Sequence, residues 1–439
     1  GEVKEYTSPG EAKESVEDTP LAAVDELNDD SFYRVATARH AYDTSSAGML
    51  LDYNGITMIY STFNGCISEF LEKMGCTTYS ATQLLGLNNR TFLSALASVK
   101  YYSCYDDHTR PLPYGYEDIL HTTVNGRETT VSENQFALPL GYTYTNAISE
   151  EELEEYSVLE RQEVMMQEVV LNDDPDGLAG ESSAEITRQK LDILSVDQNG
   201  VFLTDHALTA KKTDEDSKYY EITLHFDGQA DTETYLVLNH AFLEGDMTEN
   251  AITLEMKLED NSLSYRFAAD DDRYGSGQED YVFNLGYHEE PVTSCTIRMS
   301  RQGQIQFDSL ELYAQPMDNM QQYTDALTED VLENVEMDTN RVSGTVSLEQ
   351  DKILVLSIPY QNGWTAYVDG KETKLQRANY MYMALPLSEG DHTIELTFEI
   401  PGMKYALVIM AGAVVLFIIL CMMRWIRNRK KRKVNSQER

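Results

Sequence analysis

Apolar and polar residues alternate with a period of two through much of the second half of the chain. The alternating runs between residues 186 and 320 are EITLHF, TYLVLNHAF, AITLEMKL, LSYRFAA, YVFNLGY, CTIRMS and QIQFDSLELYA. Alternation places every second side chain on one face of a strand, and many short strands separated by turn residues are typical of a β-sandwich. We therefore expect a jelly-roll-like β-sandwich over residues 186–320.

The preceding block mixes this period with a helical one. SFYRVATA and YNGITMIYSTF are typical of strands, and CISEFLEKMG follows them with apolar residues at positions 67, 70, 71 and 74. That spacing predicts a short amphipathic helix, which Gly75 would end as a C-cap. A second helix is predicted at 91–97. We expect a compact α+β domain over residues 31–145, preceded by an acidic lead-in at residues 1–30.

Two further segments complete the extramembrane part. Residues 146–185 begin with an acidic stretch, in which Ser149 and Glu152 have the spacing of a capping box, and continue into a loop rich in turn formers. Residues 321–402 return to alternating strands, with Asp369-Gly370 as a hairpin turn, and predict a small β-domain. The expected fold class is an α+β N-terminal domain followed by two β-sandwich-like domains and one C-terminal transmembrane helix.

Residues 405–423 run for nineteen positions without a charge. As a helix they would be roughly 28 Å long, which matches the hydrocarbon core of a bilayer. We predict a transmembrane helix at 403–425 and a basic cytoplasmic tail at 426–439, with Tyr405, Trp425, Arg424 and Arg427 as membrane anchors. The alternative is a buried core helix followed by a basic nucleic-acid tail.

The distribution of charge predicts the orientation of this helix across the membrane. Seven Lys or Arg lie between Arg424 and Lys433, and cytoplasmic flanks of membrane helices carry such an excess. Residues 1–404 are therefore expected outside the cytoplasm. The first residues, GEVKEYTSPGEAKESVED, resemble no export signal. We expect either a cleaved signal peptide or the C-terminal part of a polytopic membrane protein.

The overall charge narrows the choice of partners. The chain has 34 Lys and Arg, 74 Asp and Glu, and a net charge of −40. Eight of the basic residues and one acidic residue lie from Arg424 onward, so residues 1–423 carry 26 basic and 73 acidic residues, a net charge of −47. Nucleic acid is excluded as a partner, because phosphate binding needs clustered cations on the same domain. The lipid bilayer is the expected partner of the C-terminal helix.

The sequence offers little catalytic chemistry. No nucleophile elbow, phosphate-binding glycine loop or paired metal-ligand spacing is present, and we expect no cofactor. Asn172, Asp174 and Asp176 occupy alternate positions of a calcium-loop-like string, although position 12 of that string is Ser183 rather than Glu. The alternative is a solvated acidic loop. Cys66, Cys76, Cys104 and Cys295 allow three disulfide pairings that the sequence does not rank.

Two sets of residues are candidates for ligand binding. Trp364 with Tyr380 and Tyr382 could form an aromatic platform for a sugar ring, or the rings could pack inside the small β-domain. A polar set in the first domain could bind a substrate or acceptor through a phosphate or carboxylate, and it comprises Arg34, Asn54, Ser61, Asn64 and Lys100. The alternative for this set is structural, with ion pairs, a turn at residues 54–55 and a helix cap at residue 64.

Several of these segments together resemble a known family. They are SFYRV (31–35), YNGI (53–56), YSTFN (60–64), SVKYY (98–102), ENQFALPLGY (133–142), PYQNGWTAYVDGKE (359–372) and ALPLSEGDHTIELTFEIPG (384–402). In this order, and followed by a membrane helix, they resemble the YfhO family of bacterial membrane proteins. The resemblance is specific at both ends of the chain and weak in the central sandwich.

The resemblance implies a polytopic protein with a membrane-helix bundle of the GT-C glycosyltransferase type. It implies glycosylation of cell-envelope polymers such as lipoteichoic acid, with a polyprenyl-phosphate sugar as donor. The catalytic acidic residue of GT-C enzymes lies between early membrane helices and has no counterpart position in this chain. We expect this chain to cap the membrane-embedded site and to position the glycopolymer acceptor. The alternative is a single-anchor surface protein with a carbohydrate-binding or adhesive role and no catalysis.

Overall fold

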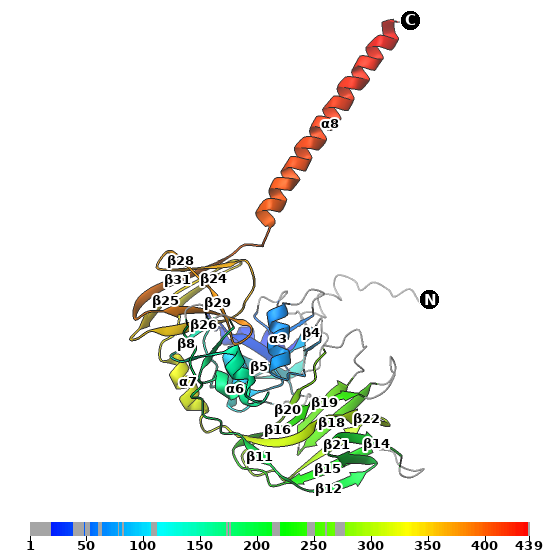
Figure 1. Cartoon of the computed structure of the whole chain (residues 1–439), viewed down its shortest axis with the longest axis vertical. Helices are drawn as coiled ribbons and strands as arrows, with labels where there is room; N and C mark the ends of the chain where they lie inside the picture. The colour runs from blue at the N-terminus through cyan, green and yellow to red at the C-terminus, as the bar shows by residue number, and fades with distance from the viewer. Residues whose placement is uncertain are drawn as a thin grey trace.

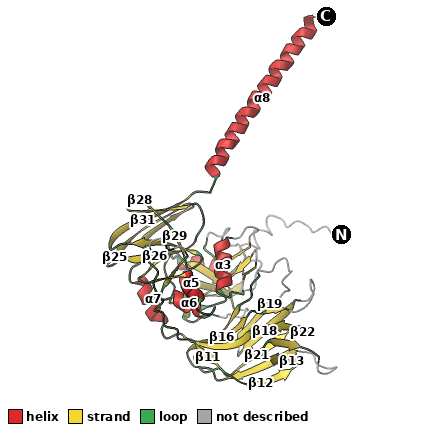
Figure 2. Ribbon diagram, in the orientation of Figure 1, coloured by secondary structure: helices red, strands yellow, loops and turns green. Residues whose placement is uncertain are grey.

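The computed structural model describes residues 19–37, 48, 53–59, 64–77, 79–80, 83–106, 112–172, 174, 177–212, 220–243, 251–259, 261–267 and 277–437, the last ten of them as backbone only. Strands dominate these residues, with short helices between them and one long helix at the C-terminal end (Figure 2). The predicted fold class is confirmed.

The first domain is built on a four-stranded sheet with the order β1-β5-β7-β6. β1 runs parallel to β5 and the other pairs are antiparallel. The strands are β1 (Arg34–Thr37), β5 (Val99–Tyr105), β6 (Tyr116–Val124) and β7 (Arg127–Asn134). The 3-10 helix η1 (Pro20–Leu27) packs on this sheet through Leu21, Ala23 and Val24. A small second sheet contains β2 (Thr57–Ile59), β4 (Gln83–Leu85) and β3 (Tyr79–Ser80).

Both helices predicted for this domain are present, as α3 (Gly65–Lys73) and α4 (Thr91–Leu96). Asn64 caps α3, because its side-chain oxygen accepts a hydrogen bond from the backbone N–H of Cys66 at 2.9 Å. Gly75 follows the helix with a φ of +61°, the left-handed conformation that ends many helices. The apolar side of α3 is buried at Ile67, Phe70 and Leu71.

A six-stranded sheet joins segments that are distant in sequence. Its order is β8-β26-β30-β29-β10-β9. The strands are β8 (Gly141–Tyr144), β9 (Ala147–Ser149), β10 (Val169–Leu171), β26 (Lys352–Pro359), β29 (Gln376–Ala378) and β30 (Tyr382–Leu387). One hydrophobic core continues from α3 and α4 through this sheet to α7 (Met320–Thr328). Residues of the predicted first domain and of the predicted small β-domain therefore share one sheet and one core.

The acidic stretch after residue 146 contains less helix than its composition indicates. It forms α5 (Glu150–Glu154), capped by Ser149, and α6 (Glu160–Met165), with β9 before them and β10 after them. β10 is buried at all three positions, and its backbone pairs with β9 and β29. Burial between two neighbouring strands favours an extended backbone over a continuation of the helix.

The central β-sandwich contains three sheets. The first has the order β11 (Gln189–Leu191), β23 (Ser309–Pro316), β16 (Thr232–Asn239), β20 (Tyr281–His288). The second has the order β12 (Ile193–Asn199), β15 (Tyr220–Phe226), β21 (Ser294–Met299), β18 (Ile252–Leu258), β19 (Asn261–Phe267). The third has the order β13 (Val201–Thr204), β14 (Ala207–Ala210), β22 (Gly303–Gln306), β17 (Phe242–Leu243). Their inward side chains form a separate core, as the period-two pattern predicts.

The small β-domain adds a five-stranded sheet that leads to the C-terminal helix. Its order is β24 (Glu333–Asp338), β25 (Arg341–Leu348), β31 (Gly390–Phe398), β27 (Trp364–Val368), β28 (Lys371–Thr373). The turn at Asp369-Gly370 has φ angles of 52° and 74°, as a two-residue hairpin requires, so this prediction is confirmed. A third core lies under this sheet and includes Leu140.

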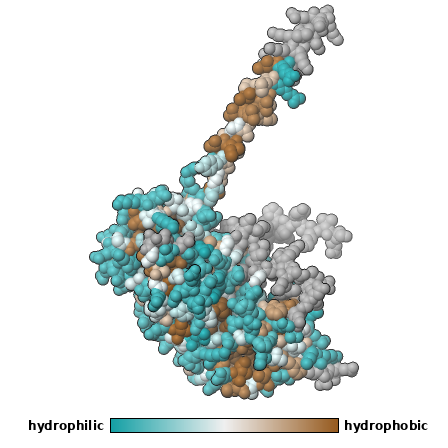
Figure 3. All heavy atoms as spheres, viewed as in Figure 1, coloured by the Kyte–Doolittle hydropathy of each residue, from teal (hydrophilic) through white to brown (hydrophobic). Residues whose placement is uncertain are grey.

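Only residues 399–402 separate β31 from α8 (Met403–Gln437). Figure 1 shows α8 as a rod that leaves the body beside this sheet, while the sandwich lies at the opposite end. Residues 403–427 contain an 18-residue window with a mean hydropathy of 3.0 and qualify by length and composition as a membrane span. Figure 3 shows the apolar surface of the rod against the largely hydrophilic body. Tyr405 and Trp425 are 78% and 58% exposed, and twenty helical residues separate them by roughly 30 Å.

Candidate functional site

Arg34 lies where the first domain meets β26. Its guanidinium donates hydrogen bonds to the carbonyl oxygen of Ala97 at 2.8 Å and to the Oγ and carbonyl oxygen of Ser357 at 3.1 and 2.6 Å. It also lies 5.0 Å from the ring centroid of Phe32. Burial lowers the pKa of Arg34, and Ser98 Oγ lies 2.8 Å from Ser357 Oγ in the same cluster. These hydrogen bonds of Arg34 are thus with carbonyl and hydroxyl oxygens of the fold, rather than with the carboxylate of the ion pair that the structural alternative predicts.

Lys100 is paired within its own domain. Its Nζ lies 2.7 Å from Asp29 Oδ2 and 3.8 Å from Glu133 Oε1. Partial burial would raise the pKa of Asp29, but hydrogen bonds from Lys100, Ser31 and Tyr101 hold it well below its usual range. The cation of Lys100 is therefore largely neutralised by the two carboxylates.

The other polar candidates are spread over the same domain. Asn64 donates from its Nδ2 to the carbonyl oxygen of Tyr360 at 3.1 Å, in addition to capping α3. Asn54 donates to the carbonyl oxygen of Tyr33 at 3.3 Å. Ser61 lies outside the described residues. Arg34 thus contacts β26 and Asn64 contacts the residue that follows it, whereas Asn54 and Lys100 have other partners. The four described members of the set do not converge on one open site.

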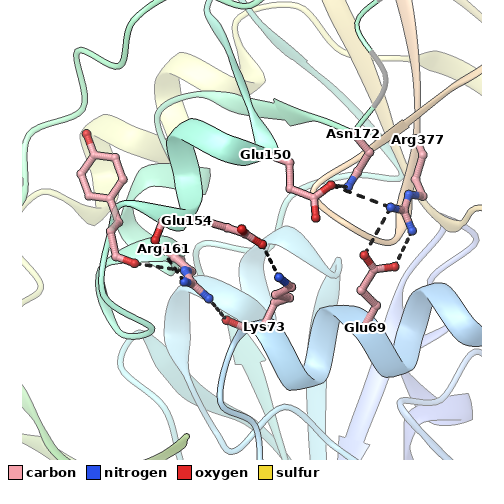
Figure 4. Close-up of polar contacts among 8 residues, drawn as sticks. Glu69, Lys73, Glu150, Glu154, Arg161, Asn172 and Arg377 are labelled. Carbon is pink, nitrogen blue, oxygen red and sulfur yellow. Dashed lines mark hydrogen bonds and ion pairs between the residues drawn. The ribbon is translucent and has the colours of Figure 1, made fainter. Parts of the chain in front are cut away.

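A network of ion pairs fixes α3 to the neighbouring elements (Figure 4). Arg377 of β29 lies 2.6 and 3.4 Å from the two carboxylate oxygens of Glu69 on α3, and 4.0 Å from Glu150. Asn172 donates to the carboxylate of Glu150 at 2.6 Å. Burial would lower the pKa of Arg377, but the hydrogen bonds to Glu69 and Cys66 raise it.

The second half of this network joins α3 to α5 and α6. Lys73 pairs with Glu154, and Arg161 donates to the carbonyl oxygens of Lys73 at 2.9 Å and Tyr156 at 3.1 Å (Figure 4). Lys73 and Arg377 of Figure 4 are therefore paired with carboxylates, and Arg161 is bound to backbone carbonyl oxygens, which indicates a structural junction rather than a set of free acids and bases.

The three proposed platform rings do not share a surface. Tyr380 and Tyr382 are 0% and 1% exposed and belong to the core that includes α3. Trp364 is half-buried on β27, where its ring centroid lies 5.3 Å from that of Phe398. These positions correspond to the alternative in which the rings pack inside, with the rings divided between two cores.

The calcium-loop-like string is also engaged in local contacts. The carboxylate of Asp174 accepts hydrogen bonds from the backbone N–H groups of Leu178 and Ala179, each at 2.8 Å. The amide of Asn172 is bound to Glu150, and Asp176 lies outside the described residues. Among the residues that the structure describes, no group of three or more His, Cys, Asp or Glu is placed to hold a metal ion.

Among the residues that the structure describes, two of the clefts are large enough for a ligand. One has a volume of about 480 Å³ and lies between the first domain and the start of β24, with Lys100 and Glu133 in its wall. The other has a volume of about 470 Å³ and lies between the first domain and the sandwich. We call it the amide cleft, because four asparagines line it: Asn88, Asn89, Asn261 and Asn284. No local sequence pattern predicts this cleft, since its walls come from separate domains.

Solved structures with some likeness to this chain include carbohydrate-active proteins. CsCBM6-3 from Clostridium stercorarium, in complex with cellobiose, is 12% identical with a TM-score of 0.19, and the match covers 30% of this chain and 93% of that one. Arabinofuranosyltransferase AftD from Mycobacteria is 9% identical with a TM-score of 0.21, and the match covers 87% of this chain and 48% of that one. At these TM-scores neither likeness bears on function.

Comparison of amino-acid sequences gives stronger evidence than these structural likenesses. The protein of Bacillus subtilis strain 168 described as uncharacterized protein YfhO is 24% identical over 343 residues. The match covers 75% of this chain and 36% of that relative, so the chain spans about a third of the relative's length. The family model described as bacterial membrane protein YfhO matches residues 3–410. The chain therefore belongs to the YfhO family of bacterial membrane proteins.

Proposed function

We propose that this chain is the extracytoplasmic region and last membrane helix of a YfhO-family protein that glycosylates a cell-envelope polymer of the lipoteichoic acid type. The donor would be a polyprenyl-phosphate sugar, and an upstream membrane-helix bundle of the same protein would carry the catalytic acidic residue. Family membership supports this proposal, together with the activity that the resemblance implies. The region described here would cap the membrane-embedded site and position the acceptor.

The orientation follows from the charge around α8. Seven cations lie between Arg424 and Lys433, and residues 1–423 carry a net charge of −47. Clustered Lys and Arg are retained on the cytoplasmic side of a membrane helix. A cysteine introduced at exposed Asn199 should react with a membrane-impermeant maleimide on intact cells, while one introduced in the basic tail should react only after lysis. Labelling of the tail on intact cells would reverse the proposed orientation.

The observation that carries the positioning role is the short connection to the membrane. Residues 399–402 join β31 to α8, and four residues span at most roughly 14 Å. The small β-domain is joined in turn to the first domain by the six-stranded sheet, the shared core and the bonds of Arg34. The end of β31 therefore stays within roughly 14 Å of the start of the membrane helix, and the first domain is joined to the domain that contains β31.

This role can be tested by loosening the connection without changing any other residue. A ten-residue Gly/Ser insert after Gly402 would add a flexible tether of roughly 18 Å root-mean-square length. We expect it to lower sugar incorporation by the intact protein about tenfold or more, because the effective concentration of acceptor at the site would fall. The matched control is the same insert at Gly126, in the turn between β6 and β7.

The outcomes separate the two roles that the sequence leaves open. Unchanged transfer with the insert after Gly402 would contradict positioning by this region. No sugar transfer by the intact, membrane-inserted protein, with every candidate polyprenyl-phosphate donor, would contradict the glycosyltransferase proposal. Binding of a glycan by such an inactive protein would instead favour the single-anchor carbohydrate-binding alternative.

A further inference from the structure

The amide cleft differs from the rest of the molecule in its charge. None of the 17 described residues that line it is Asp, Glu, Lys, Arg or His. Charged residues make up 25% of the chain, so a random set of this size would hold about four. The lining combines apolar side chains with amides and hydroxyls, and its volume of about 470 Å³ lies within the range of small-molecule sites.

Two of the asparagines hold the walls of the cleft in place. Asn284 on β20 donates from Nδ2 to the carbonyl oxygen of Asn89 at 2.7 Å, which joins the sandwich to the first domain. Its Oδ1 accepts a hydrogen bond from the backbone N–H of Gly286 at 2.9 Å. Asn88 accepts a hydrogen bond from the backbone N–H of Thr77 at 2.9 Å. These two amides are therefore committed to the structure.

The other two asparagines are available to a ligand. The side-chain amides of Asn89 and Asn261 are half-buried and have no hydrogen-bond partner among the residues that the structure describes. Gly286 has a φ of +114°, and a Cβ at that position would lie 2.2 Å from Asn261 Nδ2. The absence of a side chain at residue 286 thus leaves the space that the Asn261 amide occupies beside β20.

The chemistry of the lining selects among ligand classes. A phosphate or nucleotide needs cations, and a metal ion needs carboxylate or imidazole ligands, and the described residues of this lining provide neither. An acyl chain would leave the amides without partners. Amides and hydroxyls can donate to and accept from a cluster of hydroxyl groups, while aliphatic walls formed by Ile56, Leu112 and Met256 suit the C–H faces of a pyranose.

We propose that the amide cleft is a binding site for an uncharged sugar unit, with Asn89 and Asn261 as its hydrogen-bonding residues. The proposal deepens the proposed function and rests on it for the source of the sugar, which would be a glycosyl group on the envelope polymer. Phosphate groups of such a polymer would be repelled by the acidic body, so neutral glycosyl groups are the part that the cleft can accept. The cleft would retain polymer that already carries sugar.

The test measures binding directly, on the full 439-residue chain in lipid nanodiscs. Maltose and N,N′-diacetylchitobiose are titrated calorimetrically, with glucuronic acid and glucose 1-phosphate as anionic counterparts. We expect saturable binding of a neutral sugar and none of the anionic ones. Asn261→Asp keeps the size of the side chain but replaces a donor with a negative charge, and we expect roughly tenfold weaker binding or worse. Asn89→Asp should have a similar effect.

Asn199→Asp is the matched control, because it makes the same change on the same sheet. Asn199 ends β12 and Asn261 begins β19, and these strands form opposite edges of the five-stranded sheet, roughly 19 Å apart. We expect the control to bind sugar like the wild type, and thermal melting to show that all three variants are folded. A short neutral peptide is titrated in parallel, since amides could also bind a peptide.

The results separate this inference from the proposed function. Absence of binding by any neutral sugar at millimolar concentration, equal binding by Asn261→Asp and wild type, or preference for the peptide would each overturn the cleft assignment, whatever the transfer activity. Sugar binding that both cleft variants weaken and the control retains would support it, even if the intact protein transfers no sugar.

Discussion

Removal of the Arg34 side chain should loosen the junction between the first domain and the small β-domain. In Arg34→Ala, the carbonyl oxygens of Ala97 and Ser357 lose their guanidinium donor. Ser357 is 0% exposed and Ala97 is 4% exposed, so water cannot readily replace that donor. A buried polar group without a partner costs about 1–3 kcal/mol.

The size of the effect can be estimated from these contacts. Three hydrogen bonds to a charged group would each contribute about 1.5–3 kcal/mol, but they share one side chain and are not additive. The Arg34 side chain is also only partly buried. We therefore expect a loss of about 3 kcal/mol, which corresponds to a fall in melting temperature of roughly 4 °C for a cooperative unit of about 400 residues. The melting temperature of Arg34→Lys should lie between those of the wild type and Arg34→Ala, because a lysine can replace the charge but not the planar set of donors.

The assay is thermal unfolding of the full chain in nanodiscs, followed by tryptophan fluorescence, to which Trp364 of the small β-domain contributes. The control is Arg341→Ala, whose guanidinium pairs with Glu395 on an exposed face and should leave the melting temperature unchanged within error. Identical melting of Arg34→Ala and Arg341→Ala would refute the structural role. If Arg34→Ala then lowered sugar transfer without lowering stability or membrane abundance, Arg34 would be a binding residue instead.

Two further predictions concern stability. Gly228→Ala should destabilise the sandwich by about 2 kcal/mol or more, because a Cβ there would lie 1.9 Å from a backbone carbonyl oxygen. Gly126→Ala is the control: its Cβ would lie in open space, and its positive φ should cost only about 1 kcal/mol. Equal melting temperatures of the two variants would contradict this prediction. Burial would lower the pKa of His392, but its hydrogen bonds to Asp369 and to a backbone carbonyl raise it above its ordinary value of 6.5. The resulting stabilisation should be complete below about pH 6.5 and be lost as pH rises through the raised pKa. His392→Gln should remove this part of the pH dependence in melting curves between pH 5 and pH 9, and an unchanged profile would show that the pair does not contribute.

Local patterns in the sequence were sufficient wherever one segment determines its own structure. The period-two runs predicted the sandwich, the spacing at residues 67–74 predicted α3, and Asp369-Gly370 predicted a hairpin turn. The uncharged run at 405–423 predicted the helix that qualifies as a membrane span. Motifs at both ends of the chain resembled the family that the family model then matched.

Polar candidates were harder to interpret, because a side chain's partner decides its role. Arg34 is a candidate ligand-binding cation by sequence, and the structure places it against Ser357, 323 residues away. Lys100 is likewise paired with Asp29. The period-two spacing of Tyr380 and Tyr382 is compatible with either a surface or a core position. They are buried because α3 packs in the same core.

The sequence by itself determined the strand and helix periods, the acidic composition, the apolar helix with its basic flank, and the resemblance to a family. Each of these depends on residues that are close together along the chain or on their total number. Tertiary structure alone decided that strands from 141–171 and 352–387 form one sheet, and that Asn89 and Asn261 face the same cleft. Such contacts join residues separated by more than a hundred positions, and no local periodicity encodes which distant surfaces will meet.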